Sequence, residues 1–158
     1  MRVVILGIGN VLMSDEGVGV HAVTALQDRF RLPDGIAIVD GGTTGMELLP
    51  DLEDVDHAIV IDAVRVGQPP ATIVRLAGDD VPAFFKTKLS PHQVGLCDVL
   101  AALRFSGHAP GRVVLIGVQP DSLAMGMELS PAVAGRIEAV LDLVVAELAA
   151  LGLQPQAA

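Results

Sequence analysis

Three polar residues at three separate places in the chain could form a catalytic or metal-binding site: Glu16, Asp62 and His92. Asp62 directly follows an apolar run at residues 58–61, and Glu16 lies shortly after another at residues 2–7. If both runs are strands of one sheet, the three side chains can meet in the crevice at its carboxyl edge. Two carboxylates and an imidazole would then offer oxygen and nitrogen ligands to a borderline divalent metal.

The region around Glu16 also has a purely structural interpretation. Ser14 could cap a helix that begins at residue 15, and Asp15 and Glu16 would then stabilise its first turn through the helix dipole. Gly17 and Gly19 fit a helix interior poorly, because glycine weakens it. Glycines beside an acid at a strand end suggest that something approaches the backbone closely. The pattern leaves both interpretations of Glu16 open.

The surroundings of Asp62 and His92 favour a functional site more strongly. Asp62 could merely cap a turn, but burying a carboxylate without a partner is costly, so its apolar setting favours a site. Ser90 and Gln93 predict a capping box, and Pro91 occupies the favoured first position of the helix. His92 then lies in the first turn, where the helix dipole favours the neutral imidazole that a metal requires.

Other polar residues on the same expected edge are weaker candidates. Asp40 ends an apolar run before two glycines, so it is either a fourth acid of the site or a turn residue. Gln119 and Asp121 follow a later run and could line the crevice. Cys97 lies inside an expected helix and is interpreted as a packing residue. The remaining histidines are interpreted as structural: His21, His57 and His108.

The elements that would position these residues alternate between apolar strand-like runs and segments with helical periodicity. Strands are expected at residues 2–8, 36–39, 57–62, 73–76 and 113–116. Helices are expected at residues 15–29, 44–52, 91–105 and 130–151. This alternation predicts a parallel sheet covered on both faces. The link between the third and fourth strands is too short for a parallel crossover, so the fourth strand should run antiparallel at an edge.

The chain is expected to form one α/β domain over residues 1–152. Its 158 residues are 51% apolar, which is enough for a sizeable core. Residues 77–90 are the longest stretch without periodicity and are interpreted as a loop that leads to His92. Residues 153–158 are expected to be disordered, because they have little to bury.

Composition argues against several classes of function. The net charge of −9 opposes binding to nucleic acid or anionic membranes, and no apolar run reaches the ~20 residues of a membrane span. The absence of Trp and Tyr removes the usual stacking surfaces and disfavours a carbohydrate hydrolase built on paired acids. One cysteine excludes an internal disulfide, and no secretion signal is evident, so a cytoplasmic protein is expected.

Standard nucleotide and hydrolase motifs are incomplete or missing. The turn at Gly7 and Gly9 begins a dinucleotide fingerprint, but Leu12 stands where the third glycine belongs, and Asp15 and Glu16 would repel a pyrophosphate. Neither G-x-S-x-G nor H-E-x-x-H occurs. Any hydrolysis would therefore have to be metal-assisted or use carboxylates as acid and base.

A longer pattern resembles a known family. Residues 7–19, GIGNVLMSDEGVG, resemble the opening motif of the hydrogenase maturation endopeptidases, which process the large subunit of NiFe-hydrogenases. Further segments fit the same family in order, so the resemblance covers nearly the whole chain. These segments are DGGT at 40–43, IDA at 61–63, SPHQVGL at 90–96 and LIGVQP at 115–120.

The resemblance implies a three-layer α/β/α sandwich around a five-stranded, mostly parallel sheet. It also implies an endopeptidase that removes the C-terminal extension of the large-subunit precursor after nickel insertion. Glu16, Asp62 and His92 would bind the substrate's nickel, and Asp40 would take part in recognition or catalysis. No tightly held metal of its own is expected, although other divalent ions could occupy the site.

The expected partner is thus a protein substrate, and the protein itself is expected to be a cytoplasmic monomer. The alternative is a non-catalytic nickel metallochaperone for hydrogenase assembly. The absence of cysteine or histidine clusters weighs against that alternative, because autonomous tight sites usually need such ligands.

Overall fold

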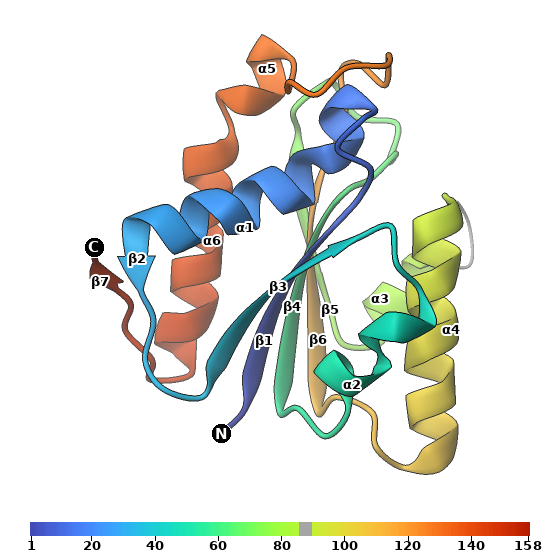
Figure 1. Cartoon of the computed structure of the whole chain (residues 1–158), viewed down its shortest axis with the longest axis vertical. Coiled ribbons are helices and arrows are strands. Elements are labelled where there is room, and N and C mark those ends of the chain that lie inside the picture. Colours follow the sequence, from blue (N-terminus) through green and yellow to red (C-terminus); the bar gives the residue numbers. More distant parts are fainter. Residues whose placement is uncertain (86–89) are drawn as a thin grey trace.

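A five-stranded sheet forms the centre of the computed structural model, which describes residues 1–85 and 90–158 (Figure 1). The strand order is β3-β1-β4-β6-β5. The first four strands in this order are mutually parallel, and β5 pairs antiparallel with β6 at the edge. The predicted antiparallel edge strand is confirmed. The strands are β1 (Val3–Ile8), β3 (Ile36–Gly42), β4 (His57–Ala63), β5 (Ile73–Ala77) and β6 (Arg112–Val118).

Helices cover both faces of the sheet and complete the predicted three-layer α/β/α sandwich (Figure 1). One face carries α1 (Val18–Arg29) and α6 (Ile137–Ala150). The other carries α2 (Leu49–Leu52), α3 (Asp80–Phe85) and α4 (Pro91–Ser106). The short helices η1 (Ser14–Gly17), η2 (Met46–Leu48) and α5 (Pro131–Ala134) complete the set. No helix in the described ranges is long and apolar enough to cross a membrane.

The buried strands explain why the sequence shows unbroken apolar runs. All six residues of β1 are buried; Val3 and Ile5 face one core, while Val4, Leu6 and Ile8 face the other. Side chains on a strand alternate between its faces, so a sheet covered on both sides needs apolar residues at every position.

Glycines let α1 lie directly on the strands that carry the site. A Cβ added to Gly19 would lie 2.1 Å from the carbonyl oxygen of Ile61, and one added to Gly7 would lie 2.2 Å from the carbonyl oxygen of Gly19. The close approach suggested by Gly17 and Gly19 is, at Gly19, that of the helix to the sheet; at Gly17 it is that of Val11, whose Cα would lie 2.7 Å from an added Cβ. The approach at Gly19 places η1, with Glu16, next to the end of β4.

Two local predictions differ from the structure. Ser14 does not cap α1: it lies inside η1 with φ of 53°, and its hydroxyl donates to the carbonyl of Ala124. The stretch 77–90 contains helix α3, which is too short to show periodicity; Val81 and Phe85, four residues apart, pack into the core. Residues 86–89 lie outside the described part of the chain.

The end of the chain also differs from the expected disordered tail. Gln156 and Ala157 form strand β7, which pairs antiparallel with β2 (Phe30–Arg31). Leu153 packs against the core under α1 and α6. Backbone pairing and one apolar contact therefore order a segment whose composition offers little to bury.

Candidate functional site

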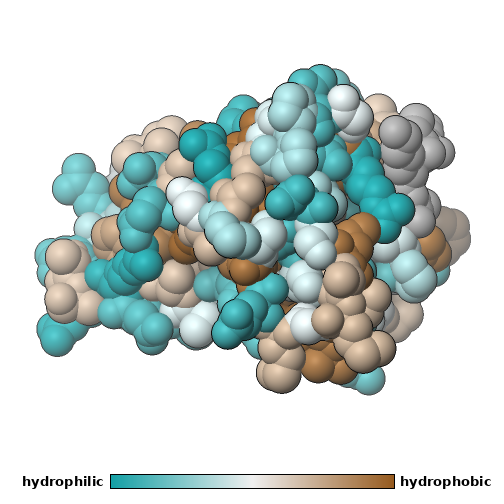
Figure 2. Space-filling view, turned by 90° about the horizontal axis from the view of Figure 1, so that it is seen from above, coloured by the Kyte–Doolittle hydropathy of each residue, from teal (hydrophilic) through white to brown (hydrophobic). Residues whose placement is uncertain are grey.

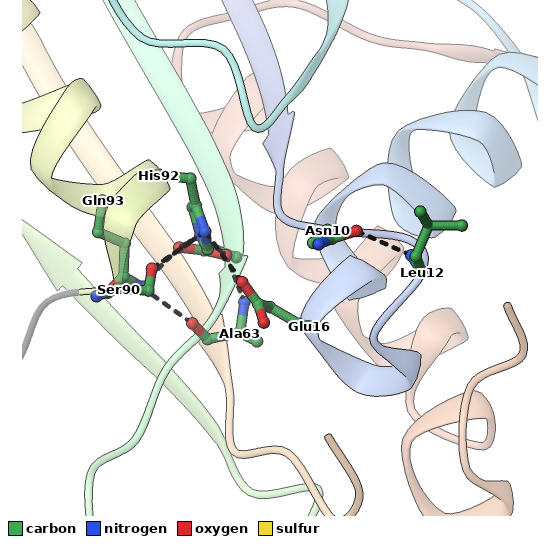
Figure 3. Close-up of polar contacts among 8 residues, drawn as sticks. Asn10, Leu12, Glu16, Ala63, Ser90, His92 and Gln93 are labelled. Atoms are coloured by element: carbon green, nitrogen blue, oxygen red, sulfur yellow. Dashed lines mark hydrogen bonds and ion pairs between the residues drawn. The ribbon is translucent and has the colours of Figure 1, made fainter. Parts of the chain in front are cut away.

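Glu16, Asp62 and His92 meet at the carboxyl edge of the sheet, as predicted. The His92 ring lies between the two carboxylates. Figure 3 shows His92 and Glu16 pointing toward each other from their separate elements. Its Nδ1 is 3.1 Å from Glu16 Oε1, and its Nε2 is 3.0 Å from Asp62 Oδ1. Each residue comes from a different element: η1, β4 and the first turn of α4. The fold thus brings together residues 76 positions apart at most, through the connections of one sheet.

Asp62 is the most deeply buried member of this network. Its side chain has no exposed surface, and its Oδ1 accepts a hydrogen bond from the backbone N–H of Ala63 at 2.8 Å. Burial raises the pKa of Asp62, and the hydrogen bonds and charge of His92, with a bond from Gln93, offset this only in part. The hydrogen bonds and the charge of its partners therefore do not fully offset the cost of removing this carboxylate from water.

The pKa of His92 shifts upward, against the sequence-based expectation of a neutral ring. Burial lowers the pKa, but the hydrogen bond and charge of Asp62, followed by those of Glu16, outweigh it. Two flanking carboxylates thus dominate over the dipole of α4. Without a metal, this ring holds its proton more strongly than an ordinary histidine.

The carboxylates of Glu16 and Asp62 lie on opposite sides of the His92 ring, so the ligand atoms of the three residues do not converge on a common point. A divalent ion needs its ligand atoms close together, yet among the described residues only Glu53, Asp54 and His108 place three such atoms within 4.8 Å of one another. The donor set at Glu16, Asp62 and His92 still suits a borderline metal. Binding one ion with all three requires loss of the imidazole proton and a turn of the ring or of Glu16, whose side chain is 22% exposed.

A cavity of about 400 Å³ opens directly above this network. Glu16 and His92 line it, whereas Asp62 lies beneath, out of the lining. The remaining walls come from α4 and from the segments that follow β4 and β6: Ala63, Arg65, Ser90, Pro91, Gln93, Pro120 and Leu123. A polypeptide segment entering this cavity could contact Glu16 and His92, but not the buried Asp62.

Gln93 connects the capping box of α4 to Asp62. Its Oε1 accepts a hydrogen bond from the backbone N–H of Ser90 at 3.1 Å, as predicted for a capping box. That bond fixes the orientation of the amide, so its Nε2 donates to Asp62 Oδ2 at 2.7 Å and to the carbonyl of Ala63 at 3.1 Å. The sequence signals the cap but gives no sign of this second role.

Asp15, interpreted from the sequence as a helix-dipole residue, is a buried anchor. Its carboxylate accepts hydrogen bonds from the backbone N–H groups of Asp121, Ser122 and Ser130, at 2.8–2.9 Å. The Ser130 hydroxyl adds a fourth at 2.7 Å. Burial raises the pKa of Asp15, but these hydrogen bonds outweigh it and the net shift is downward. No local pattern reveals partners more than 100 residues away.

The other candidates lie outside the cavity lining. Asp40 is exposed at the end of β3, and its Oδ1 accepts from the N–H of Gly42 at 3.0 Å, as in a turn. The side-chain oxygen of Gln119 accepts a hydrogen bond from the N–H of Val66 at 2.8 Å, and the backbone N–H of Asp121 donates to Asp15. Cys97 is half-buried in α4, where burial, together with Asp98, raises the pKa of its thiol. None of the other histidines lines the cavity: His21, His57 and His108.

Comparison with known proteins places this geometry in context. The family model described as hydrogenase maturation protease matches residues 20–147. The hydrogenase 2 maturation protease of Escherichia coli K12 is 48% identical over 155 residues, which cover 98% of this chain and 94% of that protein. The HupD hydrogenase expression/formation protein of Rhodobacter capsulatus is 46% identical over 97% of this chain and 74% of its own length.

Solved structures agree with the sequence comparisons. The hydrogenase maturating endopeptidase HybD from E. coli superimposes with a TM-score of 0.96 at 46% identity, covering 99% of this chain and 98% of that one. The NiFe-hydrogenase maturation protease HybD from Thermococcus kodakarensis gives a TM-score of 0.76 at 27% identity, over 91% and 97% of the two chains.

Proposed function

This chain belongs to the hydrogenase maturation protease family, and we propose that it removes the C-terminal extension from the large-subunit precursor of a NiFe-hydrogenase after nickel insertion. The observation that carries the proposal is the network of Glu16, Asp62 and His92 at the base of an open cavity. The cavity can admit a chain segment, and the network offers the oxygen and nitrogen ligands that a nickel ion accepts.

The nickel in this proposal belongs to the substrate. The ligand atoms of Glu16, Asp62 and His92 are not gathered around one point, so the chain alone offers a poor preformed site. A nickel ion already held by the precursor would supply the free energy to turn the ring or Glu16 into place. Precursor without nickel would lack that contribution, and cleavage would therefore report on metal loading.

The reaction proposed is hydrolysis of one peptide bond. A water molecule adds its oxygen to the scissile carbonyl carbon, the C–N bond breaks, and the released amine gains a proton. Glu16 is the carboxylate that reaches the cavity, so it is the group placed to accept a proton from that water. Before nickel binds, Asp62 is buried and bonded to His92, so it holds the imidazole in position.

The test is mass spectrometry of a cognate precursor incubated with this protein, with and without prior nickel loading. Loss of a C-terminal peptide from the loaded form alone is the expected result. Cleavage of both forms would keep the protease but overturn nickel as the recognition element. No cleavage of either form, together with tight nickel binding by this chain, would favour the metallochaperone.

Two histidine variants supply a matched control. His92→Ala is expected to abolish processing, because it removes the group between the two carboxylates. His108→Ala removes another histidine bound to a carboxylate, since His108 Nδ1 is 2.8 Å from Asp54 Oδ1, but at an exposed position outside the cavity lining. Equal processing by both variants would contradict the proposed site.

A further inference from the structure

Two segments that border the cavity are bound to each other and form one ledge, residues 12–14 and 124–127. The N–H of Ser14 donates to the carbonyl of Gly126 at 2.8 Å, and the N–H of Gly126 donates to the carbonyl of Leu12 at 2.9 Å. The Ser14 hydroxyl adds a bond to the carbonyl of Ala124 at 2.5 Å. Asp15, buried directly behind, binds the flanking residues of the second segment. The backbone of the ledge is therefore firmly held.

The ledge nevertheless presents large apolar side chains to solvent. Met125 is 88% exposed, Met127 is 67% exposed and Leu12 is 55% exposed. Seven large apolar side chains are exposed in the described ranges, and three of them lie on this one ledge. Figure 2 looks onto this end of the molecule and shows apolar residues, in brown tones, at the surface among hydrophilic ones. Isolated exposed apolar residues are ordinary, but a group on a fixed backbone indicates a binding surface.

The chemistry of these side chains suits contact with a protein. Methionine is flexible and polarisable, so it adapts to an irregular apolar partner. A backbone already held by hydrogen bonds loses little conformational entropy when a partner binds. The ledge thus combines adaptable side chains with a rigid base.

The ledge is continuous with the cavity, which identifies its occupant. Leu123, which lines the cavity, directly precedes Ala124 of the ledge. Glu16 follows Ser14 by two residues within η1. A folded protein whose chain segment reaches Glu16 and His92 would therefore have the ledge directly beside that segment.

We propose that residues 12–14 and 124–127 dock the folded body of the protein substrate, through an apolar surface next to the segment that enters the cavity. This inference rests on the proposed function. It assigns substrate recognition to a surface separate from the Glu16–Asp62–His92 network.

The test compares two double variants that add the same charge. Met125→Glu with Met127→Glu alters the ledge, whereas Met46→Glu with Phe105→Glu alters exposed apolar residues elsewhere. The ledge variant is expected to raise KM for nickel-loaded precursor at least about tenfold with kcat unchanged, because docked apolar contacts would be lost. The control should leave both constants unchanged, and Met125→Leu with Met127→Leu should restore KM to near the wild-type value.

Binding measured without cleavage separates this inference from the protease proposal. Precursor immobilised on a sensor should bind the His92→Ala protein, and the two ledge glutamates should abolish that binding. Loss of binding together with an inactive wild-type protein would keep the docking surface and overturn the protease. An unchanged KM, an equal rise in the control, or conversion of a dimer to a monomer by the ledge glutamates would each overturn the docking surface.

Discussion

Asp15 and Asp62 are both fully buried at the same edge of the sheet, yet their pKa values shift in opposite directions. Asp15 is surrounded by donors that cannot lose their protons at ordinary pH: three backbone N–H groups and a serine hydroxyl. Asp62 has one backbone donor, and its other partners are the side chains of His92 and Gln93.

The difference shows how one fold uses a buried carboxylate in two ways. Donors that are fixed and complete keep Asp15 ionised and turn its charge into a structural tie between distant loops. Incomplete compensation leaves Asp62 less stable as an anion and tied to a titratable ring that faces the cavity. Burial alone therefore does not distinguish a structural acid from a functional one; the identity of the donors does.

The largest expected effect comes from Asp62→Asn. The amide keeps the shape of the side chain but removes the charge that orients His92, so processing of nickel-loaded precursor should fall by about 10³-fold or more. The free energy of unfolding should change little, because the variant also removes an incompletely compensated buried charge. Precursor cleavage and urea denaturation measure the two quantities. A variant that processes normally would remove Asp62 from the site.

Asp15→Asn should show the reverse pattern. An amide nitrogen would face donors that need an acceptor, so the free energy of unfolding should fall by about 3 kcal/mol. Cleavage per folded molecule, measured well below the melting temperature, should fall far less than in Asp62→Asn. If Asp15→Asn instead stayed stable and lost all activity, the division between a structural and a functional acid would be wrong.

Substitution of Gln93 is expected to have a smaller effect, and it tests how much Asp62 depends on the partner that donates to it. Gln93→Glu can still accept the Ser90 N–H and keep the capping box, but its second oxygen cannot donate to Asp62 unless protonated. Processing and nickel-dependent binding of precursor should fall about 10–100-fold, the usual cost of losing a group that orients a metal ligand.

Gln93→Leu serves as the comparison for the glutamate variant. It loses both the cap and the donation to Asp62, so its activity should fall to a similar extent while its stability falls further. Activity that follows stability across the two variants would mean that Gln93 acts only as a cap.

The sequence predicts the framework of this site better than its details. The unbroken apolar runs and the short link before Ile73 were enough to predict the sheet and its antiparallel edge, because both follow from local burial and chain length. The strand ends, together with the capping box at Ser90 that begins the helix of His92, were likewise enough to predict that Glu16, Asp62 and His92 come together. The position of the imidazole between the carboxylates depends on side-chain packing from three elements, which no local pattern contains.

The same limit applies to Asp15 and to the ledge. The donors to Asp15 lie 106 to 115 residues away, so its neighbours in the chain suggest only a first-turn acid. Met125 and Met127 look like ordinary apolar residues until their exposure is known. Tertiary contacts, rather than propensity, decide what these residues do.

The smallest expected effect is the pH dependence of stability. Asp15 has a folded pKa below its ordinary value of 3.8, so it stabilises the protein fully above pH 3.8, and this contribution is lost as pH falls through the folded pKa. The unfolding free energy of Asp15→Asn is expected to be lower than that of wild type at neutral pH, and this deficit should shrink as pH falls below 3.8. Urea denaturation of both proteins across that range measures the difference.

Asp62 should give a pH dependence of opposite sign. Its folded pKa lies above 3.8, so the folded protein binds more protons than the unfolded chain between 3.8 and the folded pKa, and stability falls as pH rises through that window. Relative to wild type, Asp62→Asn should gain stability as pH rises there, whereas Asp15→Asn should lose it as pH rises towards 3.8. The quantity to compare is the difference in unfolding free energy between each variant and wild type. If this difference changed with pH in the same direction for both variants, donor identity would not separate these carboxylates, and their common burial would govern both.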